Sequence, residues 1–484
     1  MPRQFVRCPP DPEMVAGFDR IREQLDVPLG FAPHVAQAAE DSRSAGPQLP
    51  PGAPDAVRDA RHIPFVAIDP PGSRDLDQAF AAETRGGGHR VFYAIADVAA
   101  LVDPGGPVDL EARARGLTLY SPDLRTSLHP EPINEDAGSL LQGRERQALL
   151  WTIDLDENGE IIDARLERAR VVNTAQLTYR EAQQQIDAGT ASASLALLRT
   201  IGEQRLALEE ARGAVSLALP SQEVVHRTDG SFALEFDESL VVEDWNAQIS
   251  LLTGIAASRI MIDAGVGLLR TLPVPESRTV DQIRRTALAL DIDWPKGMGY
   301  AERVRSLRPD TPARAALLSQ AARGLRGAGY VSFADRDVPH ERTHSAIAST
   351  YAHVTAPLRR LCDRFANEII VAHCADHRAP AWAVEALEEL PSLMGAASQR
   401  DRNLERAVVD FVEAKILVGR VGETFAAIVT DVDEDRGRGR VQLRDPAVVA
   451  RLPADGLDLG SEVTVRLDEA HPDDRLVRFS LVSA

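Results

Sequence analysis

The sequence predicts an α+β fold with a central domain of mixed sheet and helices, a short helical module before it and an OB-type β-barrel after it. Strand-like runs divided by glycine turns occur between residues 62 and 166. Helical spacing of apolar residues dominates from residue 177 to residue 415. Short strand-like runs then fill roughly the last 70 residues, which is typical of a small barrel.

The chain of 484 residues is long enough for two to four domains. The Asp11-Pro12 pair predicts the start of a helix that reaches Leu25, and a second helix is expected over Pro33–Ala39. A linker rich in Pro and Gly follows from Ser42 to Asp55. We therefore expect an N-terminal module, in the manner of a helix-turn-helix, with its linker at 1–58, the central domain at 59–413 and the barrel at 414–484.

The strands of the central domain are expected to form two hairpins. The apolar run His62–Asp69 suggests a buried strand, and the glycines at 86–88 separate it from a second run over Arg90–Val102. A second hairpin is predicted for Leu150–Leu155 and Ile161–Leu166, around Asn158-Gly159. Beyond it the sequence predicts helices over 177–224, 243–264, 276–328 and 357–415, with a strand at Phe232–Phe236.

The net charge of −19 opposes a general basic surface for nucleic acid, because such binding comes from Lys and Arg on phosphates. A local exception is the stretch from Arg342 to Cys362, which contains no acidic residue. Composition alone leaves two interpretations of it, an anion-binding segment or a helix packed against an acidic neighbour. The C-terminal segment has more acidic than basic residues, so it would bind RNA only through a few well-placed arginines.

The chain is expected to be cytoplasmic and not to bind membranes. Charges interrupt every apolar stretch well before about 18 residues, and the first residues lack the apolar core of a signal peptide. Cys8, Cys362 and Cys374 are widely spaced, which indicates reduced thiols and no disulfide framework.

Three aspartates form the most informative cluster. Asp69 ends a predicted strand, a Pro-Pro-Gly turn follows, and Asp75 and Asp77 share one side of an extended segment. Converging carboxylates repel one another unless a cation neutralises them, and such oxygen ligands suit Mg²⁺ or Mn²⁺. The alternative is a solvated Asp-rich turn; an EF-hand calcium loop does not fit, because its glycine and terminal Glu are absent.

The segment Ile68–Ala79 resembles the catalytic signature of the RNB family, exoribonucleases of the ribonuclease II and ribonuclease R type. A second stretch, YAHVTAPLRRLCD at 351–363, resembles a downstream arginine motif of the same family. The likeness extends over roughly residues 60–415 and includes Leu177–Ala182 and the pair Glu243-Asp244. It implies an RNB catalytic domain and a chain that binds single-stranded RNA.

The resemblance also implies a role for each matching residue. Asp69, Asp75, Asp77 and Gln78 match the metal-binding positions, with Mg²⁺ as the expected ion and Mn²⁺ as the alternative. Asp75, Asp77 and Arg359 are the implied catalytic residues. A guanidinium suits the scissile phosphate because it is always charged and binds phosphate oxygens in pairs; the alternative for Arg359 is a helical salt bridge to Asp363.

Four residues are implied to contact RNA. Tyr120 would stack on a base near the 3′ end, and its alternative is a half-buried strand tyrosine. Glu243 would contact the terminal nucleotide, and its alternative is a first-turn acid of a helix. Arg359 and Arg360 complete the set, with a structural role as the alternative for Arg360.

The sequence departs from the family pattern at three positions in these motifs. Gln78 stands where the family has an acid, Ala356 where it has Ser, and Leu361 where it has Tyr. A carboxamide brings no charge, so metal binding would be weaker. About sixty N-terminal residues are also too few for the two cold-shock barrels usual in these enzymes.

The function expected from the resemblance is 3′→5′ hydrolysis of single-stranded RNA to nucleoside 5′-monophosphates by divalent-metal catalysis. RNA would enter between the central domain and the barrel. One alternative is a non-catalytic RNA-binding protein on the same scaffold, motivated by Gln78 and the acidic surface. Another is a metal-dependent phosphodiesterase of small nucleotides. No protein partner is indicated.

Overall fold

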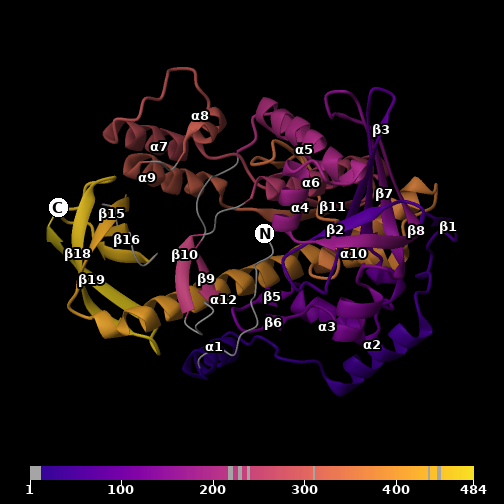
Figure 1. Cartoon of the computed structure of the whole chain (residues 1–484), viewed down its shortest axis with the longest axis horizontal. Helices are drawn as coiled ribbons and strands as arrows, with labels where there is room; N and C mark the ends of the chain where they lie inside the picture. The colour runs from indigo at the N-terminus through magenta and orange to yellow at the C-terminus, as the bar shows by residue number, and fades with distance from the viewer. Residues whose placement is uncertain are drawn as a thin grey trace.

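The structure is a computed structural model that describes residues 12–215, 222–226, 232–236, 240–308, 311–433, 437–443 and 448–483. Figure 1 shows N-terminal helices, a central sheet with helices, and a C-terminal sheet at the far end of the molecule. This arrangement confirms the predicted α+β class. Within the described ranges, no helix is long and apolar enough to cross a membrane.

The N-terminal part contains two helices, α1 (Pro12–Gln24) and α2 (Pro33–Ala45), as predicted. The second helix runs into the segment expected to be a linker. Its end is fixed by Ser42, whose hydroxyl donates to the carbonyl of Leu101 at 2.6 Å. Gly46 then stops the helix with a φ of 75°, a conformation that favours glycine.

The central sheet has the strand order β1-β8-β2-β3-β4-β7, and β7 also pairs with β8. All its strands except β1 therefore close into a ring. The strands are β1 (Val57–Asp59), β2 (Phe65–Ile68), β3 (Gln78–Arg85), β4 (Gly88–Ala96), β7 (Glu145–Leu155) and β8 (Ile161–Leu177).

The two faces of this ring carry different side chains. The inner face is rich in alanine, which suits the narrow space inside a small ring: Ala67, Ala79, Ala81, Ala94, Ala148 and Ala169. The outer face carries larger side chains, among them Phe80, Tyr93 and Trp151, and these pack against helices. The alternation follows from the two-residue period of a strand.

Two predictions of strand position were wrong. The glycine turn joins β4 to β3, not to β2, and β2 lies between β3 and β8, antiparallel to the first and parallel to the second. The sequence of β3 (QAFAAETR) hides this strand, because alanine and charged residues have low strand propensity. The stretch predicted as helical up to Val224 contains strand β9 (Gln222–His226), which pairs with the correctly predicted β10 (Phe232–Phe236).

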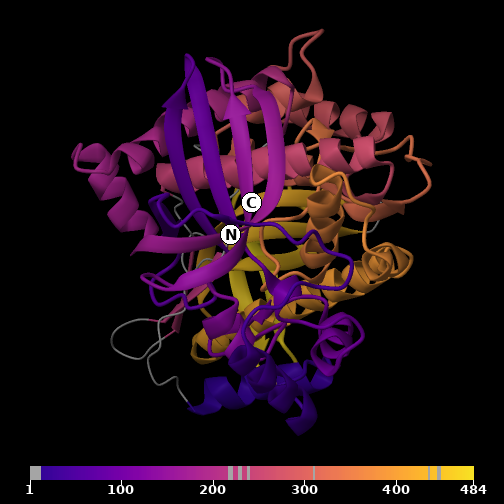
Figure 2. The same cartoon turned by 90° about the vertical axis from the view of Figure 1, so that its right-hand side faces the viewer.

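Helices cover the outer face of the ring. Those packed on its core are α4 (Tyr179–Asp187), α5 (Ala193–Ala211), α6 (Val241–Ala264) and α10 (Leu361–Cys374). Figure 2 shows the strands in front of α5 and α6. The remaining helices are α3 (Pro107–Arg115), α7 (Ser277–Ala289), α8 (Tyr300–Ser306), α9 (Pro312–Ala321), α11 (Ala381–Ala386) and α12 (Leu390–Leu417).

The C-terminal sheet has the order β17-β16-β15-β18-β19, and β17 also lies against β19, as in an OB-type barrel. Its strands are β15 (Thr424–Asp433), β16 (Arg438–Leu443), β17 (Val449–Pro453), β18 (Glu462–His471) and β19 (Leu476–Ser483). Helix α12 contributes Phe411 and Leu417 to the barrel core. The expected domain boundary at 413/414 falls inside this helix.

The close approach of α6 to residues 351–352 predicts the effect of Gly254→Ala. The new Cβ would lie 2.1 Å from the Tyr351 ring and 2.5 Å from the carbonyl oxygen of Ala352. Alanine favours a helix by about 1 kcal/mol, but this overlap outweighs the gain. We expect the free energy of unfolding to fall by about 1–3 kcal/mol in urea titrations. The matched control is Gly395→Ala in α12, where nothing lies within 4 Å and stability should rise slightly; a similar gain in both variants would contradict the packing.

Candidate active site

The loop between β2 and β3 carries the predicted aspartates. Asp69 follows β2 directly, and its amide donates to the carbonyl of Leu177 at 3.0 Å. Asp77 precedes β3, and its carbonyl accepts from the amide of Ala96 at 2.9 Å. Between them, the amide of Leu76 donates to the Ser139 hydroxyl at 2.9 Å. The chain therefore reverses as predicted, and both ends of the loop are fixed by backbone contacts.

Two of the carboxylates are deeply buried. Asp69 is 7% exposed and Asp77 is 2% exposed. The Oδ2 atom of each has no hydrogen-bond partner among the described residues. Burial raises the pKa of Asp69 to about 7 and the pKa of Asp77 to about 8, although Arg359 acts in the opposite direction on both. A bound cation would favour the ionised form of both groups.

Arg359 supplies one positive charge. Its Nε lies 3.4 Å from Asp77 Oδ2, and the amide of Leu358 donates to Asp77 Oδ1 at 2.7 Å. Burial alone would lower the pKa of Arg359, but Asp77 and Tyr120 raise it above its usual range. The predicted meeting of Arg359 with the aspartate cluster is thus present in the structure.

Arg360 points to a different partner. Its Nε and Nη2 donate to the two oxygens of Asp363 at 2.5 and 2.7 Å. Asp363 also accepts from the amide of Ala356 at 2.7 Å. The salt bridge considered for Arg359 is therefore made by Arg360, which braces the turn that leads into α10.

The hairpin of β5 (Leu119–Tyr120) and β6 (Arg125–Thr126) forms another wall of the site. Burial raises the pKa of Tyr120 to about 12, with Arg359 and Asp75 among the nearby charges. Arg125 makes close ion pairs with Asp75 and Glu135. The sequence interpretation missed Arg125, because no local motif marks it.

Glu243 lies in the first turn of α6, where its carboxylate accepts from the amide of Leu240 at 3.0 Å. This contact is the helix-capping role that was its alternative. Tyr179, at the start of α4, lies near both Glu243 and Asp69: burial, then Asp69, raises its pKa, and Glu243 adds to the effect. Tyr179 belongs to the Leu177–Ala182 segment that resembles the family. Its closeness to the carboxylates could not be predicted from that segment, because it depends on tertiary packing.

Gln78 begins β3 and turns its carboxamide oxygen to hydroxyl groups. That oxygen accepts from Tyr93 at 2.5 Å and from Ser250 at 3.3 Å. The two hydroxyls also lie 3.0 Å from each other. The atom expected to bind a metal is therefore engaged in a small polar network in the structure.

The donor set nevertheless fits a divalent cation. Asp69 and Asp77 each present a buried carboxylate oxygen that lacks a hydrogen bond within the described part of the chain. Asp75 is paired with Arg125. In the described ranges, no three acidic, histidine or cysteine side chains gather as a ready-made ligand group. Hard carboxylate oxygens are the ligands that Mg²⁺ and Mn²⁺ take.

Comparisons with known sequences show which proteins this chain resembles. The family model described as the RNB domain matches residues 57–376, and that of the RNase II-type exonuclease C-terminal S1 domain matches residues 423–482. The chain is 27% identical to exosome complex exonuclease RRP44 homolog A of Arabidopsis thaliana, covering 75% of this chain and 40% of that protein. It is 25% identical to ribonuclease R of Escherichia coli (strain K12), covering 93% of this chain and 61% of that protein.

Solved structures share the fold. Mycoplasma genitalium RNase R in complex with ribose-methylated single-stranded RNA superposes with a TM-score of 0.85 at 17% identity, over 97% of this chain and 78% of that one. Yeast Ssd1, described as a pseudonuclease, reaches a TM-score of 0.68 at 17% identity, over 95% and 58%. At these identities the likeness concerns the fold alone. Since the RNB domain model matches more than half of the sequence, the chain belongs to the RNB family.

Proposed function

We propose that the protein is a divalent-metal-dependent 3′→5′ exoribonuclease that hydrolyses single-stranded RNA to nucleoside 5′-monophosphates. The observation that supports this most is the approach of Arg359 to Asp77 at 3.4 Å, beside buried carboxylate oxygens that lack hydrogen bonds among the described residues. A guanidinium next to metal-type carboxylates is suited to a phosphodiester. Relatives named ribonuclease R and exosome complex exonuclease support the same reaction.

Each side chain takes a defined part in this proposal. Asp69, Asp75 and Asp77 would hold Mg²⁺, or Mn²⁺, which when bound activates water and offsets charge on the phosphate. Arg359 binds the scissile phosphate and stabilises the negative charge of the transition state. Tyr120 stacks on a base near the 3′ end, and Glu243 binds a hydroxyl of the terminal ribose.

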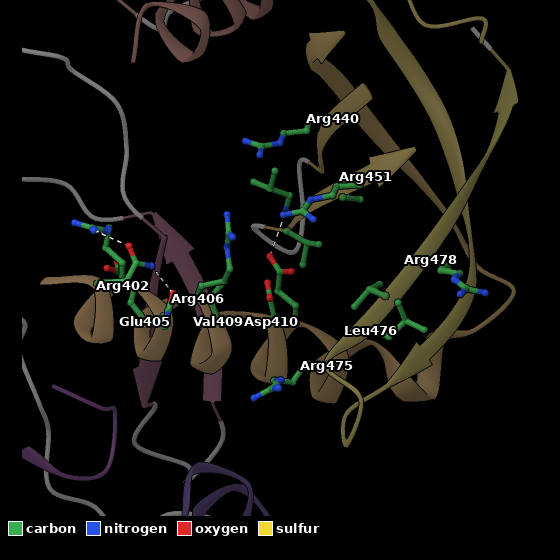
Figure 3. Close-up of a pocket in the computed structure, with 17 residues that line it drawn as sticks. Arg402, Glu405, Arg406, Val409, Asp410, Arg440, Arg451, Arg475, Leu476 and Arg478 are labelled. Carbon is green, nitrogen blue, oxygen red and sulfur yellow. Dashed lines mark hydrogen bonds between the residues drawn. The ribbon is translucent and has the colours of Figure 1, made fainter. Parts of the chain in front are cut away.

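A groove lined with arginines supports an RNA substrate longer than a dinucleotide. It encloses about 780 Å³ between α12 and the barrel. Figure 3 shows Arg406 on α12 extending toward the space beside Arg440 and Arg451 on β16 and β17. Arg402 also lines the groove, and its Nη2 donates to Gln399 at 2.9 Å. One of the acids here, Glu413, accepts from the amide of Val449 at 3.2 Å and so holds helix and barrel together. Two of these arginines, Arg440 and Arg451, belong to the C-terminal segment, and in this proposal they contact phosphates together with Arg406.

A second candidate is a non-catalytic RNA-binding protein on the same scaffold. Gln78 favours it, because this uncharged residue replaces a family acid and its oxygen is engaged by Tyr93 and Ser250. The structural neighbour yeast Ssd1, which shares this fold, is described as a pseudonuclease.

Asp77→Asn tests the two candidates. Asp77 is more buried than Asp69, and the change removes its carboxylate while keeping the size of the side chain. We therefore expect release of mononucleotides from end-labelled RNA to fall by about a hundredfold or more. RNA affinity in chelator should stay within a few-fold. Asp263→Asn is the matched control, because the side chain of Asp263 on α6 is exposed and its ion pair with His373 lies at the surface. If the wild type shows no release of mononucleotides that chelator can stop, the non-catalytic candidate is favoured.

Arg406→Ala/Arg451→Ala tests the groove. Each lost phosphate contact weakens binding and lowers the salt dependence of the affinity by about one unit of slope. We expect weaker binding of a twenty-nucleotide RNA but little change in hydrolysis of a trinucleotide. Arg43→Ala, on α2 at the other side of the molecule, is the control. Equal salt slopes in all three proteins would exclude the groove as an RNA contact.

The raised pKa values of Asp69 and Asp77 predict how stability depends on pH. Their folded values are about 7 and about 8, against about 3.9 for an unfolded aspartate. The neutral form is thus favoured on folding, and its stabilisation is complete below about pH 4 and is lost as pH rises through about 7 to 8. In chelator, the midpoint temperature of thermal unfolding should decrease as pH rises from 5 to 8. Added Mg²⁺ should raise this temperature more at pH 8 than at pH 5. Asp69→Asn/Asp77→Asn should flatten the profile; an unchanged slope would contradict these assignments.

A further inference from the structure

A buried arginine of α1 holds the hairpin that forms one wall of the site. Arg22 is 1% exposed and lies in the last turn of α1. Its Nη1 and Nη2 each lie 2.8 Å from a different carboxylate oxygen of Asp123, and Nη2 also lies 2.7 Å from Asp19. Asp123 stands in the turn between β5 and β6, and its side chain is only 7% exposed.

The two sides of this hairpin face different parts of the protein. Leu119 is 2% exposed and packs in one core with Phe18 of α1 and Phe411 of α12. The next residue, Tyr120, pairs in register with Arg125, which contacts Asp75. Because neighbouring residues of a strand point to opposite faces, fixing Leu119 and the turn also fixes the residues on the catalytic side.

The hairpin cannot hold this position by itself. Each of its strands is only two residues long, and even a full two-stranded hairpin is marginally stable alone. A two-pronged bond between a guanidinium and a carboxylate sets both distance and plane, so it restrains orientation as well. Arg20, on the same helix, pairs with Asp473 at side-chain exposures of 51% and 86%, and such exposed pairs contribute little.

We propose that Arg22 and Asp123 are positioning residues of the active site, through which α1 holds Tyr120 and Arg125 against the catalytic carboxylates. This inference rests on the proposed function for the part played by Tyr120 at the RNA end. It gives the N-terminal helix an indirect role, through the hairpin, in a site that lies in another part of the chain.

The test uses Asp123→Asn in the full chain, with Arg20→Ala as the matched control and Tyr120→Ala as the reference for lost stacking. Asp123→Asn keeps the size of the side chain and leaves the apolar contacts of α1 intact. Arg22→Lys is a second variant that keeps the charge but removes the two-pronged bond. Two measurements are made: amide hydrogen exchange of residues 117–128 in the metal-free protein, and quenching in chelator of a 2-aminopurine placed at the 3′ end of an RNA.

We expect both Asp123→Asn and Arg22→Lys to speed exchange in the hairpin at least tenfold while residues 65–68 stay protected. Asp123→Asn should lose most of the quenching, as Tyr120→Ala does, and Arg20→Ala should behave as wild type in both measurements. Unchanged hairpin exchange in Asp123→Asn overturns the inference whatever the protein does to RNA. Retained quenching with faster exchange overturns it as well, because Tyr120 would then not depend on the pair. If exchange rises but the wild type releases no nucleotides, the exoribonuclease proposal fails and the restraint of the hairpin by α1 stands.

Discussion

The proposed active site depends on the burial of one carboxylate, that of Asp77, against the segment around Leu358. The amide of Leu358 and the carboxylate of Asp77 are 281 residues apart in sequence and 2.7 Å apart in space. A buried carboxylate is costly unless it is paired and hydrogen-bonded. The catalytic loop and the arginine segment therefore stabilise each other, and neither would keep this conformation if the other moved away.

Further buried charges hold the arginine segment in register with the ring. Arg364 of α10 donates to Asp109 at 2.6 Å, and Arg168 of β8 pairs with Asp97 at 3.0 Å and closely with Glu368 of α10. Breaking a buried pair leaves an uncompensated charge, so a shifted position of α10 would be strongly disfavoured. In this way the core specifies the position of Arg359, although Arg359 itself is only one residue of an irregular turn.

Sequence reasoning reached those parts of the fold and site that depend on local pattern. The α+β class, most helices and the Asp69–Asp77 loop follow from periodicity and from spacing within a few residues. Strand β3 was missed because its alanines suit the narrow interior of the ring, a constraint that no local propensity contains. Arg125 and Tyr179 were missed because only tertiary packing brings them to the carboxylates. Gln78 was seen as a departure, but its hydroxyl partners Tyr93 and Ser250 come from two other elements.

Helix α12 passes without interruption from the central domain into the barrel, and its Phe411 packs both on Phe18 of α1 and within the barrel core. The boundary suggested by the change from helical to strand-like sequence is therefore not a place where the protein can be divided. A cut at residue 413 would split one hydrophobic core and leave an apolar surface on each fragment. The barrel is a fold that can be recognised by itself, but it is not a detachable module, and exchanging it for a related barrel would require α1, the end of α12 and the β5–β6 hairpin to be exchanged with it.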